Sequence, residues 1–150
     1  DDNCDGLENL NNPIEDCVGD VFLNPNTGAE TYLLVCSTTE TWADALSICL
    51  NADIAYDGLP KITNQFQNTS VHSILNTGNL WLGLTDSQNE GTFEWSDGSA
   101  YIQGSDYANW KNGFNSNQNA DEDCIRMNNN QEWEDKSCDG SNKIACMYEF

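Results

Sequence analysis

Residues 122–138 of the chain read EDCIRMNNNQEWEDKSC. Two adjacent carboxylates, Glu122 and Asp123, stand directly before Cys124, and a disulfide at that cysteine would hold them in place. Calcium binds about six to eight hard oxygens, which carboxylates, amides, carbonyls and water supply. The stretch therefore indicates a divalent-cation site in a polar loop region.

Further acidic side chains lie outside this stretch. Asp86 and Glu90 follow the apolar segment WLGL at residues 81–84. The whole chain of 150 residues carries 25 Asp and Glu against 5 Lys and Arg, a formal charge of −20. This charge excludes nucleic-acid binding, which needs a basic surface, and disfavours an anionic membrane. Bound cations would screen the self-repulsion of such a surface, and solubility alone is the alternative explanation of the charge.

The cysteines indicate an oxidising compartment. They are Cys4, Cys17, Cys36, Cys49, Cys124, Cys138 and Cys146. The chain has no C-x-x-C pair and one histidine, so a zinc site or a redox pair is disfavoured, and disulfides predict a secreted protein. A glycosylation acceptor at residues 68–70 agrees with secretion, and the polar start without a leader predicts a mature form. Because seven is odd, one thiol either links two chains or is buried as a free cysteine.

The length fits one domain that mixes strands with helices. Short apolar runs bounded by turn residues predict strands at residues 21–23, 32–36, 80–84, 92–95, 124–127 and 143–148. The first 20 residues are polar and predict irregular structure. A long polar loop at residues 112–123 is of the kind that carries function. Buried indoles in or beside strands are common, so Trp81, Trp95 and Trp133 are predicted in the core, and Tyr101 and Tyr107 are expected to be buried as well.

Two helices are predicted. A capping-box pattern formed by Ser37 and Glu40 predicts the start of the first helix. Its apolar face comprises Trp42, Ala45, Leu46 and Cys49. The second helix is predicted over residues 64–75, with Asn64 as its cap. His72 lies on this helix, where we expect a surface or structural role.

Four segments together resemble the C-type lectin domain: Trp42 to Ala45 before Cys49, WLGL at 81–84, Glu122 to Cys124, and QEWED at 131–135 before Cys138 and Cys146. The resemblance covers residues 17–150 and leaves 1–16 as a polar leader. It implies an α+β fold, in which two helices flank antiparallel strands, the chain ends lie close together and a long loop region binds calcium. It also implies the bridges Cys49–Cys146, Cys124–Cys138 and Cys17–Cys36. Cys4 is then the candidate for an interchain bond in a disulfide-linked homodimer.

The resemblance further implies two calcium sites. The residues matching the family's auxiliary site are Asp86, Glu90, Asn117, Glu122 and Asp123. Asn117 stands where a carboxylate is common, so one charge is lost there. The second, sugar-contacting site would share Glu122 and add Glu134 and Asp135, from the W-E-D that replaces the family's W-N-D. Ser116 is a further candidate ligand.

The sugar-selecting tripeptide departs from the family pattern. Phe114, Asn115 and Ser116 stand ten residues before Cys124, in place of E-P-N or Q-P-D. An ionised Glu134 accepts hydrogen bonds but cannot donate one as the family's amide does, so the mannose pattern of donors and acceptors is lost. Glu134 could compensate for the missing glutamate, and Phe114 or Trp110 could stack on the apolar face of galactose. Alternatively, the second site does not function and calcium only stabilises the loops.

Three functions follow as hypotheses. The first is a secreted, calcium-dependent lectin that binds galactose-type glycans, with weak single-site affinity that a dimer would offset. The second is a lectin-like domain for a non-sugar ligand such as ice, a mineral surface or another protein. The third, an enzyme, is disfavoured because the sequence shows no nucleophile–base pair.

Overall fold

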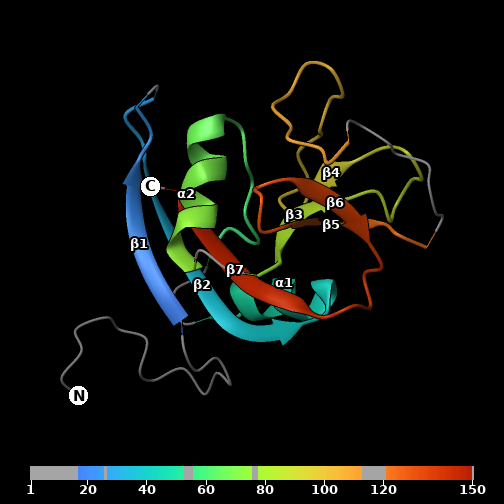
Figure 1. The fold of residues 1–150 in the computed structure, drawn as a ribbon, viewed down its shortest axis with the longest axis horizontal. Coiled ribbons are helices and arrows are strands. Elements are labelled where there is room, and N and C mark those ends of the chain that lie inside the picture. Colours follow the sequence, from blue (N-terminus) through green and yellow to red (C-terminus); the bar gives the residue numbers. More distant parts are fainter. Residues whose placement is uncertain (1–16, 26, 53–55, 76–77, 113–120, 150) are drawn as a thin grey trace.

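The computed structural model describes residues 17–25, 27–52, 56–75, 78–112 and 121–149. Within these residues the chain forms an α+β fold, as predicted (Figure 1). In chain order the elements are β1 (Cys17–Leu23), β2 (Glu30–Glu40), α1 (Trp42–Leu50), α2 (Gln65–Leu75), β3 (Leu80–Thr85), β4 (Glu94–Trp95), β5 (Cys124–Met127), β6 (Trp133–Lys136) and β7 (Asn142–Glu149). Neither helix among the described residues is long and apolar enough to cross a bilayer.

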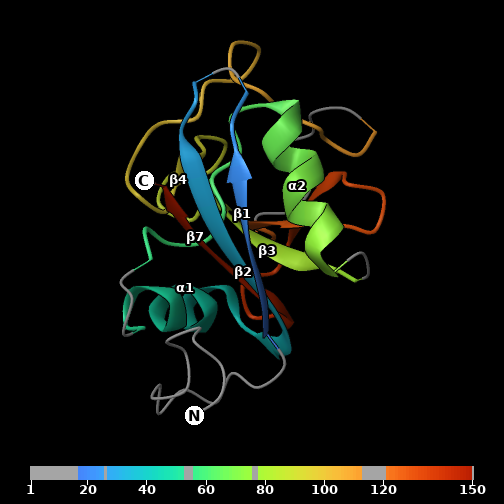
Figure 2. The ribbon, with the colours of Figure 1, turned by 90° about the vertical axis from the view of Figure 1, so that its left-hand side faces the viewer.

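One sheet organises the molecule. Its strands run in the order β1-β2-β7-β3-β5-β6, and β4 pairs with β3. Neighbours are antiparallel except for β3 and β7, which pair in parallel. In Figure 2 the long strands β2 and β7 run between α1 and α2, so the helices cover opposite sides of this part of the sheet. Both faces of β2 are therefore covered, which explains why Leu33, Leu34 and Val35 are all buried despite pointing alternately to the two sides.

The predicted aromatic core is confirmed. Trp81, Trp95 and Trp133 are all buried, and Trp133 lies edge to face with Trp95 at 6.0 Å between ring centroids. Tyr101 is buried and Tyr107 is half-buried. A buried indole needs a partner for its N–H, and Trp81 donates from Nε1 to the carbonyl of Glu40 at 2.7 Å. This hydrogen bond ties β3 to the end of β2.

The start of α1 differs from its prediction. Ser37 and Glu40 do not form a capping box, because residues 37–40 continue β2, where Glu40 pairs with Asn142 of β7. The N-cap is Thr41, whose Oγ1 accepts a hydrogen bond from the amide of Asp44 at 3.3 Å. Sheet pairing thus moves the helix start beyond the pattern that predicted it. The predicted apolar face holds, since Ala45 and Cys49 are buried and Trp42 and Leu46 pack against the core.

The second helix begins where it was predicted. The Oδ1 atom of Asn64 accepts from the amide of Gln67 at 2.8 Å and so caps α2. Val71 is buried, and Ile74 packs against the core. His72 has a structural contact, with its Nε2 atom 2.7 Å from the carbonyl oxygen of Asn129.

Three disulfides hold the described chain together, and they are the three predicted pairs: Cys17–Cys36, Cys49–Cys146 and Cys124–Cys138. Cys17 and Cys36 face each other across β1 and β2, so Cys17 to Asp20 belong to a strand and the prediction of irregular structure is wrong there. Cys4 and the predicted leader at 1–16 lie outside the described residues.

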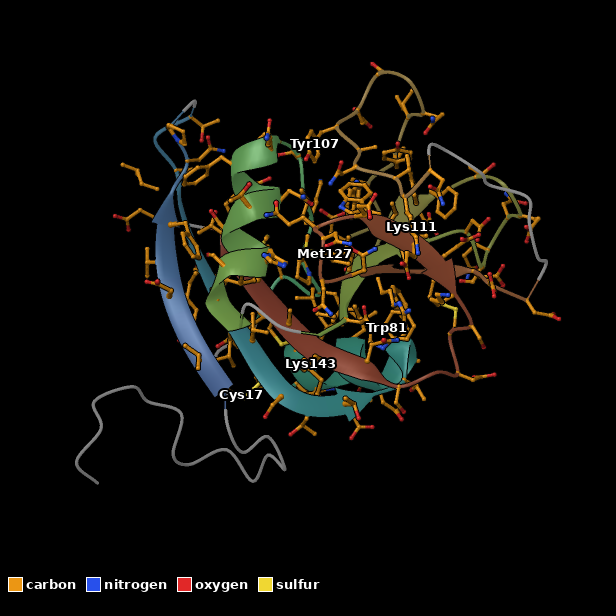
Figure 3. The ribbon with its side chains drawn as sticks, in the orientation of Figure 1. Cys17, Trp81, Tyr107, Lys111, Met127 and Lys143 are labelled. Atoms are coloured by element: carbon orange, nitrogen blue, oxygen red, sulfur yellow. A yellow bond between two sulfur atoms is a disulfide. The ribbon has the colours of Figure 1, made fainter. Side chains whose placement is uncertain are left out.

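The chain ends themselves, at 1–16 and 150, lie outside the described residues, so the expectation that they lie close together stays a prediction. β1 and β7 both pair with β2, but Cys17 lies opposite Cys36 whereas Glu149 lies opposite Thr31. Because both pairings are antiparallel, the start of β1 lies beside the middle of β2 and the end of β7 lies beside its start (Figure 3 labels Cys17).

Candidate metal and ligand site

The carboxylates of Asp86 and Asp123 meet where β3 ends and β5 begins. Thr85 pairs with Cys124 across these antiparallel strands, so the residues just beyond the pair, Asp86 and Asp123, are brought together. The amide of Asp86 donates to the carbonyl of Asp123 at 3.0 Å. The Oγ1 atom of Thr85 donates to the same carbonyl at 2.6 Å. One backbone hydrogen bond and one from a threonine hydroxyl therefore fix both positions independently of the side-chain carboxylates.

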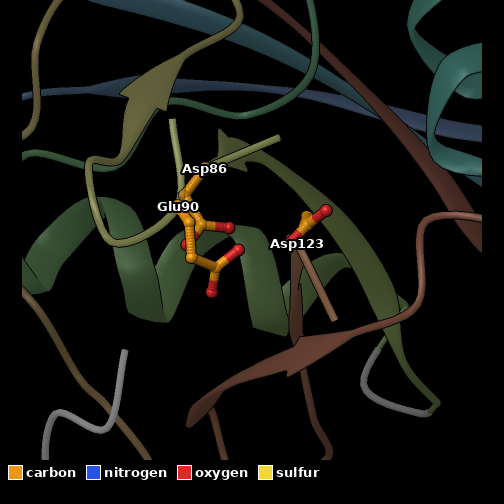
Figure 4. A group of neighbouring side chains, drawn as sticks. All are labelled: Asp86, Glu90 and Asp123. Atoms are coloured by element: carbon orange, nitrogen blue, oxygen red, sulfur yellow. The ribbon is translucent and has the colours of Figure 1, made fainter. Parts of the chain in front are cut away.

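A tight turn adds Glu90 to the pair. The amide of Asn89 donates to the carbonyl of Asp86 at 3.2 Å, and the amide of Gly91 donates to Oδ2 of Asp86 at 2.9 Å. Gly91 has φ of 82°, which a side chain would disfavour. The turn carries Glu90 back over Asp86, and carboxylate oxygens of Asp86, Glu90 and Asp123 all lie within 4.8 Å of one another (Figure 4).

The electrostatics of this acidic triad, Asp86, Glu90 and Asp123, favour a cation. Asp86 is only 2 % exposed, and burial raises its pKa in spite of the hydrogen bond from Gly91, with Asp123 adding repulsion. Desolvation and the carboxylates of Asp86 and Asp123 likewise raise the pKa of Glu90. One buried oxygen of Asp86 and one of Asp123, both Oδ1, accept no hydrogen bond within the described part of the chain. Buried orphan carboxylate oxygens are costly, and a hard cation such as calcium would satisfy them, so the triad fits that ion.

Two other predicted ligands lie near the triad. Glu122 and Asp135 are half-buried, and burial followed by the charge of Glu122 raises the pKa of Asp135. The charge of Asp135 also raises the pKa values of Asp86 and Glu90, after the larger contributions named above. The predicted auxiliary and second sites are therefore electrostatically connected. The predicted ligands Asn117 and Ser116, and with them Phe114 and Asn115, lie outside the described residues.

Glu134 has a different environment. Its Oε1 atom is 3.2 Å from Nζ of Lys111, and its Oε2 atom is 3.0 Å from Nη2 of Arg126 and 3.9 Å from Nζ of Lys136. Asn128 also donates from Nδ2 to Oε1 at 2.9 Å. Burial raises the pKa of Glu134, but the hydrogen bonds from Asn128, Lys111 and Arg126 outweigh it and lower the pKa to about 2.

These partners of Glu134 were not predicted from the sequence. The signal was the pairing of β5 with β6, which places Arg126 opposite Glu134. Because β6 was not predicted as a strand, the pairing of Arg126 with Glu134 could not be predicted either. An acidic, four-residue strand carries a weak apolar pattern, and only Trp133 is buried in it.

Trp110, a predicted sugar contact, packs at the edge of the aromatic core. Its ring centroid lies 5.4 Å from that of Trp133 and 5.6 Å from that of Phe93. Its Nε1 atom donates to the hydroxyl of Tyr101 at 3.1 Å. The side chain stays half-buried, so its ring is held in one orientation while part of it faces outward.

Asn68, the predicted glycosylation acceptor, is buried at 1 % exposure. Its Nδ2 atom donates to the carbonyl of Gln131 at 3.1 Å, and its Oδ1 atom accepts from Nε1 of Trp133 at 2.8 Å. Both ends of the amide are thus used, and they join α2 to Trp133 of β6 and to Gln131 just before that strand. A glycan on this nitrogen is incompatible with the fold described.

Comparison with known proteins agrees with this architecture. Rat (Rattus norvegicus) lithostathine is 28 % identical over 116 residues, which cover 72 % of this chain and 66 % of lithostathine. The mouse scavenger receptor C-type lectin carbohydrate-recognition domain superposes with a TM-score of 0.65 at 27 % identity, over 79 % of this chain and 88 % of that one. A herring type II antifreeze protein shares the fold, with a TM-score of 0.67 at 24 % identity, over 80 % of this chain and 92 % of that one.

The chain thus covers 66 % of lithostathine's own length, which is slightly less than two thirds. The family described as the Lectin C-type domain matches residues 38–148, which is most of the chain. This chain therefore belongs to the C-type lectin domain family.

Proposed function

We propose that this protein is a secreted carbohydrate-binding lectin whose loop region is held by calcium at the acidic triad. The observation that carries the proposal is the pair of buried Oδ1 atoms of Asp86 and Asp123, which lack hydrogen-bond donors among the described residues. Charged oxygens are retained in such a position when a cation compensates them. We therefore assign the triad as the principal calcium site.

Glu122 and Asp135 complete the proposed calcium-binding region. Both lie within electrostatic reach of the triad or of each other, and carboxylates here would raise the ligand count towards the six to eight or so oxygens that calcium takes. Asn117 and Ser116 remain proposed ligands from their sequence positions. Calcium ligation by Glu134 would require release of Lys111 and Arg126, so a second calcium ion is expected to bind more weakly than the first.

The proposed ligand is a galactose-type glycan. The chain lacks the E-P-N tripeptide, and the cations around Glu134 take up the oxygens that would otherwise compensate for it. Trp110 supplies a fixed aromatic ring beside this region, and Phe114, from its sequence position, could supply a second. An aromatic ring packs against the continuous C–H face of galactose, so we propose stacking together with polar contacts from Asn115, Glu122 and Asp135.

The test is a glycan array probed with the protein in millimolar calcium and again with a chelator. The proposal predicts binding to galactosides that chelation abolishes. Binding only to mannosides would contradict the galactose assignment, and an absence of glycan binding in calcium would contradict the lectin assignment. A matched pair of variants, Asp86→Asn in the triad and the exposed Asp139→Asn outside it, separates loss of calcium from a general change of charge.

A second candidate is a lectin-like domain with a non-sugar ligand. The specific observation in its favour is that Glu134 is already held by three cations and an amide, so it offers a sugar no free carboxylate. A herring antifreeze protein has the same fold. Inhibition of cell agglutination by free galactose would favour the lectin, whereas agglutination or surface binding that free sugars leave unchanged would favour this candidate. We propose binding rather than catalysis in either case.

Secretion and dimer formation complete the proposal. Three disulfides among the described residues are typical of an oxidising compartment. They use six of the seven cysteines and leave Cys4, which we propose as an interchain link. Electrophoresis without reductant should show a dimer that Cys4→Ser converts to a monomer. A monomeric wild type would contradict the link.

A further inference from the structure

Most of the positive charges of the chain are gathered in one place. The whole sequence has 5 Lys and Arg, and three of them, Lys111, Arg126 and Lys136, converge on the carboxylate of Glu134. The chain as a whole carries a formal charge of −20, which repels anions from most of its surface. Within the described residues, this basic cluster, Lys111, Arg126 and Lys136, is therefore a local concentration of positive charge on an otherwise acidic chain.

The fold builds the cluster from three segments. Arg126 of β5 lies opposite Glu134 of β6, and Lys136 follows two residues along β6, on the same face of the strand. The amide of Lys111 donates to the carbonyl of Trp133 at 3.0 Å, which lays the segment carrying Lys111 beside β6 (Figure 3 labels Lys111). Sheet pairing thus holds the backbone of each cation in position.

Glu134 and the three members of the basic cluster differ in their exposure. The side chain of Glu134 is 11 % exposed and that of Arg126 is 23 % exposed, whereas Lys136 is 40 % and Lys111 is 49 % exposed. Arg126 has a second partner, since its Nη1 atom donates to Oδ1 of Asn142 at 3.1 Å. The inner carboxylate and guanidinium are therefore fixed, and the two ammonium groups form the outer, solvent-facing layer.

One carboxylate does not neutralise three cations. The carboxylate of Asp135 offsets part of this excess positive charge, because Lys136 is near enough to lower the pKa of Asp135. Burial and the charge of Glu122 have larger effects on that pKa, and both raise it. Lys111 pairs at 3.2 Å with Glu134 alone among the ion pairs formed by the described residues, and each lysine has three donors. Both ammonium groups therefore keep donors that can turn towards a ligand.

We propose that Lys111 and Lys136 form an anion subsite that recognises a sulfate or carboxylate group on the bound sugar. This inference rests on the proposed carbohydrate binding and names the class of glycan: an acidic one. Trp110 precedes Lys111 in the chain and is half-buried, so a sugar ring stacked there would place a charged substituent near the ammonium groups. Charge-assisted hydrogen bonds from lysine would then add to binding without calcium in contact with the anion.

The test compares galactose, galactose 6-sulfate and a galacturonate on one array, all in calcium. Wild type should bind at least one acidic sugar about tenfold more tightly than galactose, and the sulfate and uronate arms identify which anion is recognised. The double variant Lys111→Gln/Lys136→Gln should lose this preference and keep its binding to galactose. Lys61→Gln is the matched control, because Lys61 pairs with Asp97 outside the cluster and is 37 % exposed.

Glu134→Gln gives the sharpest readout. Replacing the internal carboxylate removes the competitor for the ammonium groups, so affinity for the acidic sugar should rise in this variant. A purely structural ion network predicts a loss of stability and no such gain. Equal binding of acidic and neutral galactosides, or a preference that the lysine variants retain, overturns the subsite while leaving the lectin intact. An array with no bound glycan rejects the proposed function itself and this subsite with it.

Discussion

Asn68 shows how one buried amide joins two elements. Its Oδ1 atom is the partner of the indole N–H of Trp133, which is 1 % exposed. Asn68→Ala leaves that N–H without an acceptor, and we expect the free energy of unfolding to fall by about 1–3 kcal/mol. Denaturant titration measures the change, with the exposed Asn130→Ala as a control. Equal stability of Asn68→Ala and wild type would contradict this role.

The environment of Glu134 predicts a pH dependence of stability. Its pKa is lowered from 4.5 to about 2, so the folded state binds fewer protons than the unfolded state between these values. Its stabilising contribution is therefore complete above pH 4.5 and is lost as the pH falls towards 2. Denaturant titrations at several pH values, with a chelator present, should show a smaller loss of stability in this range for Glu134→Gln than for wild type. Parallel pH profiles of the two proteins would argue against the ion pairs.

At the scale of elements, the start of α1 offers a direct comparison between sequence pattern and structure. Thr41 caps the helix, whereas Ser37 lies in β2. Thr41→Ala should lower the free energy of unfolding by about 1 kcal/mol, because an orphan helix amide loses its acceptor. Ser37→Ala is the control and should change stability less. A larger loss of stability for Ser37→Ala than for Thr41→Ala in denaturant titrations would favour the capping box instead.

Local sequence predicted those elements whose signals are local. The cap at Asn64 and the strand at Cys124–Met127 were found because a polar cap and an apolar run are read within a few residues. Residues 37–40 were misassigned because their pairing partner, β7, is about a hundred positions away in the sequence. For the same reason the cations around Glu134 were missed, since β6 becomes visible as a strand only once β5 pairs with it.

At the scale of the whole molecule, the fold and the acidic triad could be inferred because the cysteines and carboxylates follow one another along the chain in the order of the C-type lectin domain family. Asp86 and Asp123 were predicted together, and the pairing of Thr85 with Cys124 explains why they meet. The sequence does not reveal that one oxygen of Asp86 and one of Asp123 lack hydrogen-bond donors, or that Glu134 is an ion-pair partner. Both facts depend on which donors lie nearby once the chain has packed. Charge sign alone does not distinguish a ligand from an ion-pair partner.

Calcium binding at the acidic triad should change the stability of the whole molecule. Without the ion, burial and repulsion raise the pKa values of Asp86 and Glu90, so these groups cost stability as the pH rises and they ionise. With calcium bound, the ionised carboxylates are stabilising, and protons compete with the metal. Calcium stabilisation should therefore shrink on acidification.

The most direct measurement is thermal unfolding of the whole chain at neutral pH, in millimolar calcium and in chelator. We predict that calcium raises the Tm of wild type and of Asp139→Asn by several degrees or more, which corresponds to about 2 kcal/mol or more of mass-action stabilisation at saturating ion. Asp86→Asn should show little calcium response and, because one repelling charge is gone, a Tm in chelator at or above that of wild type. Superimposable wild-type melting curves in calcium and chelator would contradict the assignment of the triad as a calcium site.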